Sequence, residues 1–278
     1  MAKANFQELL DAGVHFGHLK RKWNPNMAPY IFDEKKGIHV IDLNKTIVKA
    51  NESAAALKQI AMSGKKILFV ATKKQAKDIV SKLVEEVNMP YVVERWTGGM
   101  LTNFGTTRKS VRKMHAIDKM EQDGTMKTLS KRERLMLARK REKMNKVLGS
   151  VSEMTRLPAA IFVVDIRKEH IAVKEATKLG IPIFAMVDTN SDPREVDFAI
   201  PSNDDATKSI SKIVGMMTEA VKEGLEDRKS SKAKSDAAKA KSDAKAAAPK
   251  AAAPKAAAAA AAAAPKEEAP KDAAPEAK

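Results

Sequence analysis

The sequence of 278 residues contains no cysteine, and this absence excludes two kinds of structure. Without thiols the chain can form neither a disulfide framework nor a thiolate metal site. It also lacks an apolar stretch of the roughly 20 residues that a membrane helix needs, apart from an alanine run too weakly apolar to insert. Its first residues, Met1 to Phe6, lack the apolar core of a signal peptide. We therefore expect a cytoplasmic protein with no membrane partner.

Aromatic residues are scarce and acidic residues are outnumbered by basic ones, and both features point to the same kind of partner. Only 4% of the residues are aromatic, so few nucleotide bases could be held by stacking. The 51 lysines and arginines outnumber the 35 acidic residues and give a formal net charge of +16. Such a charge attracts polyanions through long-range attraction and counterion release, although DNA and anionic lipid are attracted as well as RNA. Contacts to a nucleic acid should therefore go mainly to phosphates and to RNA shape.

The last part of the chain differs in composition from the rest. Residues 229–278 are mainly alanine, lysine and proline, include no large apolar residue, and carry a net charge of +5. Such a segment cannot bury enough surface to offset its ordering entropy, so we expect a disordered tail. The alanines from Ala256 to Ala264 favour helix, but Pro254 and Pro265 confine them to fewer than the roughly 12 residues that an isolated helix needs.

Segment 105–156 holds most of the basic excess of the remaining chain. Its 15 lysines and arginines and 6 acidic residues give +9, whereas the rest of 1–228 nets only +2. Apolar residues recur at helical spacing in both halves, and Asp123-Gly124 interrupts the pattern. This predicts two helices folded back as a protruding antiparallel coiled-coil hairpin, although an ordinary helical pair packed on the core would show similar spacing. The apolar positions are Val111, Met114, Ile117, Met120 (or Glu121), Leu137, Met144, Val147, Leu148 and Val151.

Short apolar runs alternate with helical patterns in the flanking regions 1–104 and 157–228. Continuous apolar runs are typical of strands that are buried on both faces. Their alternation with helices predicts one α/β domain with a parallel sheet, into which the hairpin is inserted. The predicted strands are 67–71, 161–164 and 183–187, with shorter candidates at 38–41 and 91–93. The predicted helices are 45–62, 74–87, 168–179 and 204–222.

An α/β sheet raises the possibility of a nucleotide-dependent enzyme, but the phosphate-binding loops of such enzymes are absent. No G-x-G-x-x-G follows a strand and no G-x-x-x-x-G-K-[ST] occurs. The nearest feature is Thr72-Lys73-Lys74, where a strand turns into a helix and free backbone N–H groups would favour a phosphate. In an RNA-binding protein this turn could hold a backbone phosphate, but it could equally be a simple helix start with solvated lysines.

Histidines and aspartates occur at positions from which a metal or hydrolytic site could be assembled. His15 and His18 lie close in sequence, and Asp42, Asp165 and Asp188 lie at or just after strand ends, where α/β enzymes carry function. No H-x-x-x-H or H-E-x-x-H pattern accompanies them. We therefore expect capping, turn and ion-pair roles for the aspartates, with no cofactor, no metal site and no enzymatic activity.

Two clusters combine a tryptophan with basic residues. Trp23 follows Arg21 and Lys22 in a loop that is too polar for the core, and Trp96 follows Arg95 just before two glycines and the basic segment. Arginine and tryptophan can both stack on bases or sugars, and glycine permits close backbone approach. Packing of either tryptophan against the α/β body is an alternative of equal weight.

These segments belong to longer blocks that resemble the bacterial ribosomal protein S-two family, nearly colinearly from about Leu9 to Glu223. Several long blocks in the same order are more specific than any single motif. Ala71, Thr97 and Phe198 stand where the family pattern has glycine, leucine and tyrosine, but none of these differences removes a charged residue. The blocks are LLDAGVHFGHLKRKWNPNMAPYIFDEKKGIHVIDLNKT (9–46), KILFVATKKQA (66–76), RWTGGMLTNF (95–104), LPAAIFVVDIRKEHIAVKEATKLGIPIFAMVDTNSDP (157–193) and IPSNDDATKSI (200–210).

The resemblance implies a flavodoxin-like, three-layer α/β domain with an inserted coiled-coil hairpin, and a structural role in the small ribosomal subunit. It implies a position between the head and body of that subunit, near the mRNA exit. The implied partners are small-subunit rRNA and other small-subunit proteins, and the chain would help to dock the mRNA-binding ribosomal protein of the S-one family during translation. No small-molecule substrate is implied, and the tail has no counterpart in the family pattern.

We expect the rRNA contacts to come from basic side chains, with neighbouring aromatic and amide side chains ordering the RNA-facing loops. The expected phosphate contacts are Arg21, Lys22, Lys73, Lys74, Arg95, Arg108, Lys109, Arg112 and Lys113. The expected loop-ordering residues are Trp23, Trp96 and Asn103. Two alternatives stay open: an α/β enzyme that binds a phosphorylated small molecule at 72–74, and an extra-ribosomal adaptor whose tail recruits partners.

Overall fold

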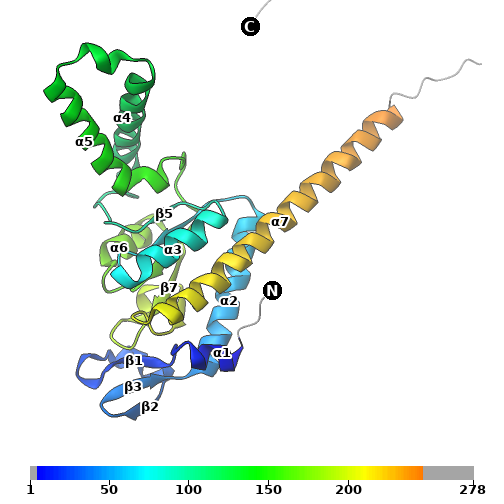
Figure 1. Ribbon diagram of the computed structural model, residues 1–278. Coiled ribbons are helices and arrows are strands. Elements are labelled where there is room, and N and C mark those ends of the chain that lie inside the picture. The colour runs from blue at the N-terminus through cyan, green and yellow to red at the C-terminus, as the bar shows by residue number, and fades with distance from the viewer. Residues whose placement is uncertain (1–4, 247–278) are drawn as a thin grey trace, which may run out of the picture. The chain divides into compact units, whose positions relative to one another are not determined.

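A computed structural model describes the backbone of residues 5–246 and the side chains of residues 5–231 (Figure 1). The chain divides into two compact units, Met1–Lys234 and Ser235–Lys278. No helix in the described part of the chain is both long and apolar enough to cross a membrane. The first unit contains both of the sheets and the basic segment.

A five-stranded parallel sheet forms the centre of the first unit. Its strands, in spatial order, are β5 (Tyr91–Val92), β4 (Ile67–Val70), β6 (Ala160–Val164), β7 (Ile183–Val187) and β8 (Phe198–Pro201). Every residue of β4, β6 and β7 is buried, which agrees with their continuous apolar runs. The predicted α/β class with a parallel sheet is therefore confirmed, and β8 is a further strand that the sequence pattern did not predict.

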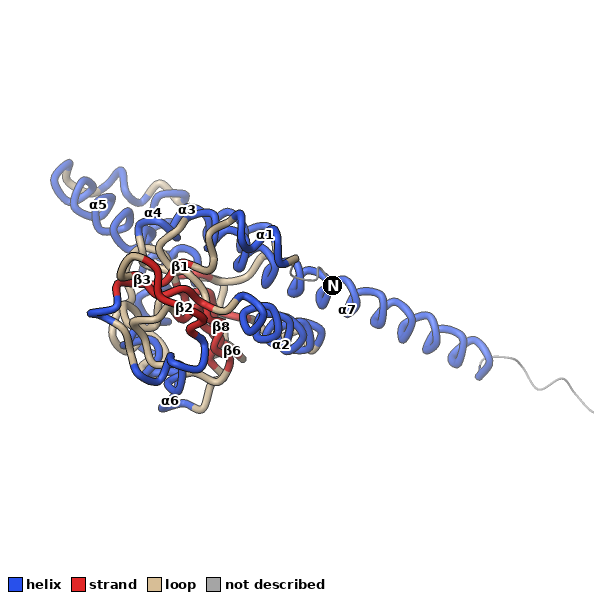
Figure 2. Tube along the Cα trace, turned by 90° about the horizontal axis from the view of Figure 1, so that it is seen from below, coloured by secondary structure: helices blue, strands red, loops and turns tan. Residues whose placement is uncertain are grey.

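Helices cover both faces of this sheet, because alternate strand residues point to opposite sides. One buried cluster contains Phe69 and Phe162, and the other contains Leu68 and Val163. Figure 2 shows α2 and α6 on opposite sides of the strands. The helices that contribute to the first cluster are α2 (Leu43–Met62), α3 (Lys74–Glu86) and α7 (Thr207–Ala246), and α6 (His170–Leu179) contributes to the second. All four begin close to their predicted positions.

A small antiparallel sheet lies before the central sheet in the chain, in the spatial order β1–β3–β2. The predicted strand at 38–41 belongs to this small sheet and not to the central one. Lys36 and Gly37 join β2 to β3 with φ angles of 54° and 77°, as a two-residue hairpin turn requires. The elements of this region are α1 (Phe6–Asp11), β1 (Phe16–Leu19), the 3-10 helices η1 (Lys20–Lys22) and η2 (Pro25–Tyr30), β2 (Ile31–Lys35) and β3 (Ile38–Ile41).

The backbone of Gly17 in the small sheet lies directly against Thr189, just after β7. A substitution of Gly17 tests this close approach. A Cβ atom on Gly17 would lie 2.6 Å from Cγ2 of Thr189 and 3.0 Å from the carbonyl oxygen of His39. We expect Gly17→Ala to lower the free energy of unfolding by about 2 kcal/mol in urea denaturation. The added methyl group would overlap neighbouring atoms, and the backbone there has little room to move away. Gly215→Ala is the control, since nothing lies within 4 Å of its added Cβ. An equal loss in both variants would contradict the close approach.

The basic segment folds into two helices, α4 (Phe104–Gln122) and α5 (Lys131–Leu148), which lie side by side (Figure 1). Gly124, with a φ of 73°, and η3 (Thr125–Thr128) reverse the chain at the predicted break. Ser130 then starts α5 with a capping box that includes Glu133. Asp118 of α4 accepts a 2.6 Å hydrogen bond from Arg141 of α5. The remaining short 3-10 helices are η4 (Gly149–Val151) and η5 (Pro193–Glu195).

Helix α7 continues beyond the predicted start of the tail. Disorder was expected from 229, but the helix runs to Ala246. The first part of α7 is buried against the sheet, and this packing offsets the unfavourable free energy of helix nucleation. The alanines and lysines that follow favour helix and extend it. The first proline of the tail is Pro249. The expectation for 247–278 lies outside the described residues.

Candidate nucleic-acid interface

The solvent-facing side of α4 carries three of the predicted phosphate contacts. Lys109, Arg112 and Lys113 are exposed, and no hydrogen bond or ion pair holds any of them within residues 5–231. They share one side of the helix, because residues three and four apart lie on one face, and the buried Val111 and Met114 lie on the other side. Their charges are therefore available to a polyanion.

Arg108 and Asn103 have local roles at the base of α4. Nη1 of Arg108 donates a 2.8 Å hydrogen bond to the carbonyl oxygen of Met154, which joins the start of α4 to the segment that follows α5. Asn103 stands at the N-cap, and its Oδ1 accepts a 2.8 Å hydrogen bond from Thr106. Arg108 is half-buried and its guanidinium is partly committed, whereas Asn103 is exposed.

Trp96 packs against the body and does not offer an open ring to RNA. Its side chain is only 7% exposed, and its Nε1 donates a 3.2 Å hydrogen bond to Glu175 of α6. Trp96 therefore packs on the α/β body, which was the second of the two interpretations of its place in the sequence. Arg95, its neighbour, is exposed.

Glu175 organises the whole loop between β5 and α4, and the sequence did not point to it. Its carboxylate accepts hydrogen bonds from the backbone N–H groups of Gly99 at 2.7 Å, Leu101 at 3.0 Å and Thr102 at 3.0 Å. The Thr102 hydroxyl adds a further bond at 3.1 Å. Burial alone would raise the pKa of Glu175, but these donors outweigh it and lower the pKa. The loop that leads into the basic helices is thus fastened by one charged side chain.

Trp23 keeps part of its ring exposed beside two exposed cations. Its side chain is 38% exposed, and its ring centroid lies 5.3 Å from that of His39. Arg21 and Lys22, both in η1, are exposed. The backbone N–H of Asn24 donates a 2.8 Å hydrogen bond to the carbonyl oxygen of Thr189 and holds this loop at the end of β7.

Lys73, one of the predicted phosphate contacts, is surrounded by the protein's own carboxylates. Its Nζ lies 2.8 Å from Asp204, 2.7 Å from Asp205 and 3.2 Å from Asp165. Burial alone would lower the pKa of Lys73, but Asp204 and the other two carboxylates outweigh it and raise the pKa. Its ammonium therefore fastens loops at the ends of β4, β6 and β8, whereas Lys74 is exposed.

The remaining donors of the 72–74 turn are also occupied from within the protein. The backbone N–H of Thr72 donates a 3.1 Å hydrogen bond to Glu169, and its hydroxyl donates to the same carboxylate. Burial raises the pKa of Glu169. A phosphate at this turn would have to displace this carboxylate and would face Asp165 and Asp204. The arrangement therefore disfavours the predicted anion site.

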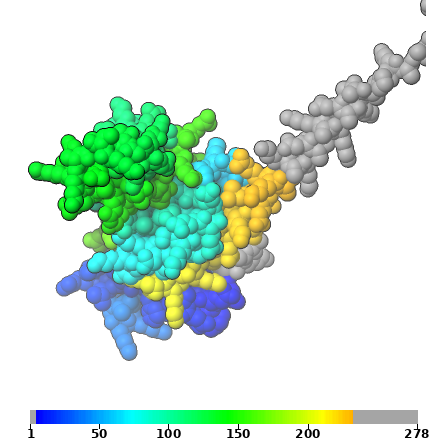
Figure 3. All heavy atoms as spheres, turned by 45° about the horizontal axis from the view of Figure 1, so that its top comes forward, coloured from blue at the N-terminus to red at the C-terminus, as the bar shows by residue number. Residues whose placement is uncertain are grey.

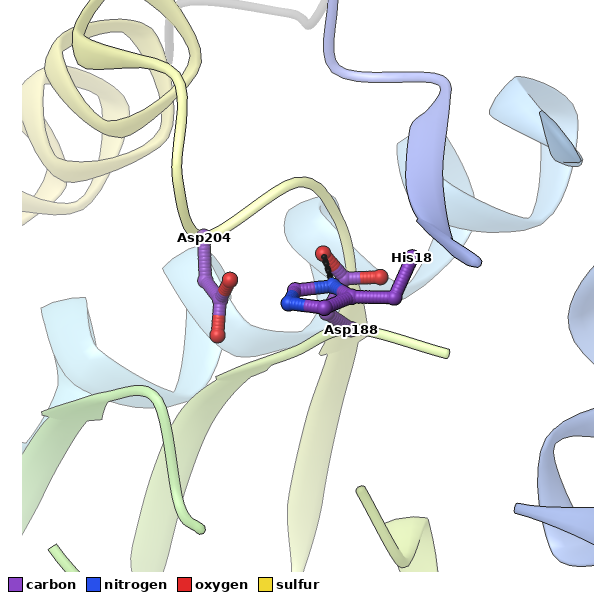
Figure 4. A group of neighbouring side chains, drawn as sticks. All are labelled: His18, Asp188 and Asp204. Carbon is purple, nitrogen blue, oxygen red and sulfur yellow. Dashed lines mark hydrogen bonds and ion pairs between the residues drawn. The ribbon is translucent and has the colours of Figure 1, made fainter. Parts of the chain in front are cut away.

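His18, Asp188 and Asp204 form a further polar group at this edge of the sheet (Figure 4). Nδ1 of His18 lies 2.9 Å from Oδ2 of Asp188, and this hydrogen bond raises the pKa of His18. Burial raises the pKa of Asp204 to about 7, with Asp165 and Asp188 adding to the shift. Oδ2 of Asp204 is buried and has no hydrogen-bond partner among the described residues.

A divalent cation is the kind of metal that this group could hold. One histidine nitrogen and two carboxylate oxygens lie within 4.8 Å of one another, which is a donor set that Zn²⁺ accepts. The three residues come from β1 and from the loops after β7 and β8, so no short spacing in the sequence could have predicted the group. His15 is not part of it, and burial lowers the pKa of His15.

The predicted residues fall into two groups at opposite ends of the first unit. Arg21, Lys22 and Trp23 follow β1, and Lys74 starts α3 after β4 at the same edge of the central sheet. The α4–α5 pair lies at the other end, as Figures 1 and 3 both show. Sequence reasoning also missed the exposed cations of α5, because within the helical pair it placed the contacts on α4 alone. These are Lys131, Arg132, Arg134, Arg139, Lys140, Lys143 and Lys146.

The fold and its polar groups define a strongly basic α/β protein with an inserted helical pair. The candidate phosphate-binding turn of this protein, 72–74, is occupied by the protein's own side chains. A family model described as ribosomal protein S2 matches residues 9–224. The chain is 62% identical over 237 residues to the small ribosomal subunit protein uS2 of Phocaeicola vulgatus, which covers 85% of each chain. It is 63% identical over 247 residues to the protein of the same name from Flavobacterium johnsoniae, covering 89% of this chain and 97% of that one.

The chain belongs to the ribosomal protein S2 family, which is the S-two family that its sequence blocks resemble. It is therefore a structural ribosomal protein and not an enzyme.

Proposed function

We propose that the chain is a structural constituent of the small ribosomal subunit and binds small-subunit rRNA in the cytoplasm. The observation that carries this proposal is the α4–α5 pair, whose segment 105–156 has a net charge of +9 and whose cations face solvent. Released counterions would drive such binding, and the scarcity of aromatic residues favours phosphate and shape recognition over base stacking. The name of the relatives, small ribosomal subunit protein uS2, supports the same assignment.

The proposed architecture is a flavodoxin-like domain that carries an antiparallel coiled-coil hairpin. In support, the strands of the central sheet lie in the order second, first, third, fourth, fifth along the chain, which is the flavodoxin-like winding. The least exposed residues of α5 include Leu137, Arg141, Met144 and Leu148, and their spacing of four, three and four residues is that of a coiled-coil seam.

The rRNA contacts that we propose are the cations that the structure leaves exposed. Two groups at opposite ends of the first unit would allow one chain to bridge two RNA segments. Trp23 would order the first group, while Trp96, Asn103 and Arg108 hold the base of α4 in place. Lys73 is left out because three carboxylates hold it. The proposed contacts are Arg21, Lys22, Lys74, Arg95, Lys109, Arg112 and Lys113.

We also propose that the chain helps to dock the mRNA-binding ribosomal protein of the S-one family. A docking role needs exposed apolar surface, and the small sheet provides it. Phe16 and Leu19 of β1 are about half exposed, and Phe32 of β2 is more exposed still. These side chains support a protein contact at the end of the unit away from the helical pair.

Sedimentation of the native protein tests the proposed function directly. We expect the full-length chain in a cell lysate to migrate with small ribosomal subunits on a sucrose gradient and to leave them as salt is raised, because phosphate contacts weaken with ionic strength. Migration with the free protein fraction at low salt would contradict the proposal. Saturable thermal stabilisation by a nucleotide or sugar phosphate, without RNA association, would favour the enzyme alternative instead.

Removal of the tail separates the ribosomal role from an adaptor role. We expect a chain that ends at Lys234 to migrate with small subunits as the full chain does, because all proposed contacts lie in the first unit. The same gradient measures the result. Loss of subunit association after truncation would mean that 235–278 carries the binding.

A further inference from the structure

The outer face of α5 carries two large apolar side chains that the fold does not use. Leu135 is 51% exposed and Met136 is 58% exposed. Leu135 lies on the side of α5 opposite the stripe that faces α4, and Met136 lies on the adjoining flank, as their spacing from Leu137 and Met144 requires. Figure 1 places the start of α5 at the end of the helical pair that is far from the central sheet. Nothing in the first unit therefore covers these side chains.

Three cations surround this apolar pair at helical spacing. Arg132, Arg139 and Lys143 lie one turn before and one and two turns after it on the same side of the helix. All three are exposed, and within residues 5–231 none of them has a hydrogen bond or ion pair. The nearby acidic residues are engaged elsewhere, since Glu133 caps the helix and Glu142 pairs with Lys146. The outer face thus has an apolar pair with uncompensated positive charge before and after it along the helix.

The outer face of α4 differs from that of α5 in its exposed apolar side chains. Lys109, Arg112 and Lys113 are accompanied there by Ala116 and by Met120, which is half-buried, and no large apolar side chain of α4 is exposed. Phosphate contacts need only such cations, so the α4 face suits rRNA. A leucine and a methionine gain little from a phosphate backbone, whereas Met and Arg are enriched in protein interfaces with an apolar core and a polar rim. The α5 face therefore suits a protein.

We propose that the outer face of α5 docks an acidic protein segment with an apolar stripe, which packs along the helix as a third strand of the bundle. The inference rests on the proposed function, because such a partner would be a neighbouring protein of the small subunit. Charge complementarity selects the partner: carboxylates meet Arg132, Arg139 and Lys143, while apolar residues cover Leu135 and Met136. The hairpin then grips RNA with α4 and protein with α5.

A photo-crosslinker at Met136 tests which class of molecule covers this face. The full-length chain would carry p-benzoylphenylalanine at position 136, or at the exposed Ala116 of α4 as a control, and would be incorporated into small subunits before irradiation. We expect position 136 to crosslink to one subunit protein, at a peptide with acidic residues beside apolar ones, and position 116 to crosslink to rRNA. Crosslinks from 136 to rRNA alone, to a peptide without acidic residues, or to nothing would overturn the inference.

A pair of surface substitutions provides a second measurement that does not depend on folding. In subunits that carry the L135Q/M136Q variant, the partner protein identified by the crosslink should remain bound after washing about tenfold less than in subunits with the unchanged chain. The reason is that buried apolar residues at the centre of an interface carry most of its binding energy. V48Q, at an exposed valine of α2, is the matched control and should change nothing. Equal retention in both variants would overturn the inference. Failure of the unmodified chain to enter small subunits would instead contradict the proposed function, which the gradient experiment measures separately.

Discussion

Reversal of three charges on α4, in the variant K109E/R112E/K113E, is expected to lower the affinity for small-subunit rRNA by about a hundredfold or more at physiological salt. Each lost phosphate contact also removes one released counterion, so the slope of log affinity against log salt should fall by about 3. Filter binding of the purified chain to small-subunit rRNA over a salt series measures both quantities. The three side chains are exposed and make no hydrogen bond or ion pair with any described residue, so stability should hold.

A variant with the same change in net charge separates local contact from general attraction. K65E/K82E/K174E reverses three exposed lysines that lie outside the α4–α5 pair and that form no ion pair within the described residues. We expect it to weaken binding much less and to leave the salt slope nearly unchanged. If both triple variants lost affinity equally, net charge alone would drive binding, and the assignment of α4 as the interface would be wrong.

Glu175→Ala is expected to lower the free energy of unfolding by about 4 kcal/mol, because it leaves buried donors without an acceptor. Trp96, Gly99, Leu101 and Thr102 all donate to this carboxylate. For a unit of this size such a loss corresponds to a melting temperature lower by about 12 °C. The variant should also enter small subunits poorly, since the loop that it loosens positions α4.

The pH dependence of the same site has a definite sign. The pKa of Glu175 is lower in the folded protein than its ordinary value of 4.5, so the carboxylate stabilises the fold fully above that value. This stabilisation is lost as the pH falls through the lower, folded pKa. The difference in stability between the native chain and Glu175→Gln should therefore shrink below about pH 4. Glu86→Ala, at an exposed residue without a hydrogen bond or ion pair in the described part of the chain, is the control and should change stability little at any pH.

The parts of the fold that could be predicted are those that depend on local burial and local spacing. Strands β4, β6 and β7 are buried on both faces, so their apolar runs mark them in the sequence. Strand β8 was missed because it ends in Pro201, which is tolerated since β8 lies at the edge of the sheet. The assignment of β3 to a separate sheet was missed because strand pairing depends on distant segments and not on the strand itself.

The same distinction applies to the residues of the candidate site. The exposure of a residue could be predicted where it depends on one helix, and not where its partners lie far along the chain. Exposure of Lys109, Arg112 and Lys113 followed from their positions relative to the apolar stripe of one helix. The burial of Lys73 did not, because its three carboxylate partners come from loops after β6 and β8, far along the chain. Glu175 gave no signal either, since a glutamate inside a helix is ordinary until a distant loop places five donors around it.

Sequence alone determined the class of fold, the concentration of positive charge in 105–156, the break between its two helices and the membership of the family. These properties depend on composition, periodicity and order along one chain. Only the tertiary structure decided which lysines face solvent and which are held by carboxylates, how the loop before α4 is fastened, and that α5 has a second, apolar face. Those outcomes depend on which distant segments meet in space, because a side chain's charge acts on whatever lies within a few ångströms of it.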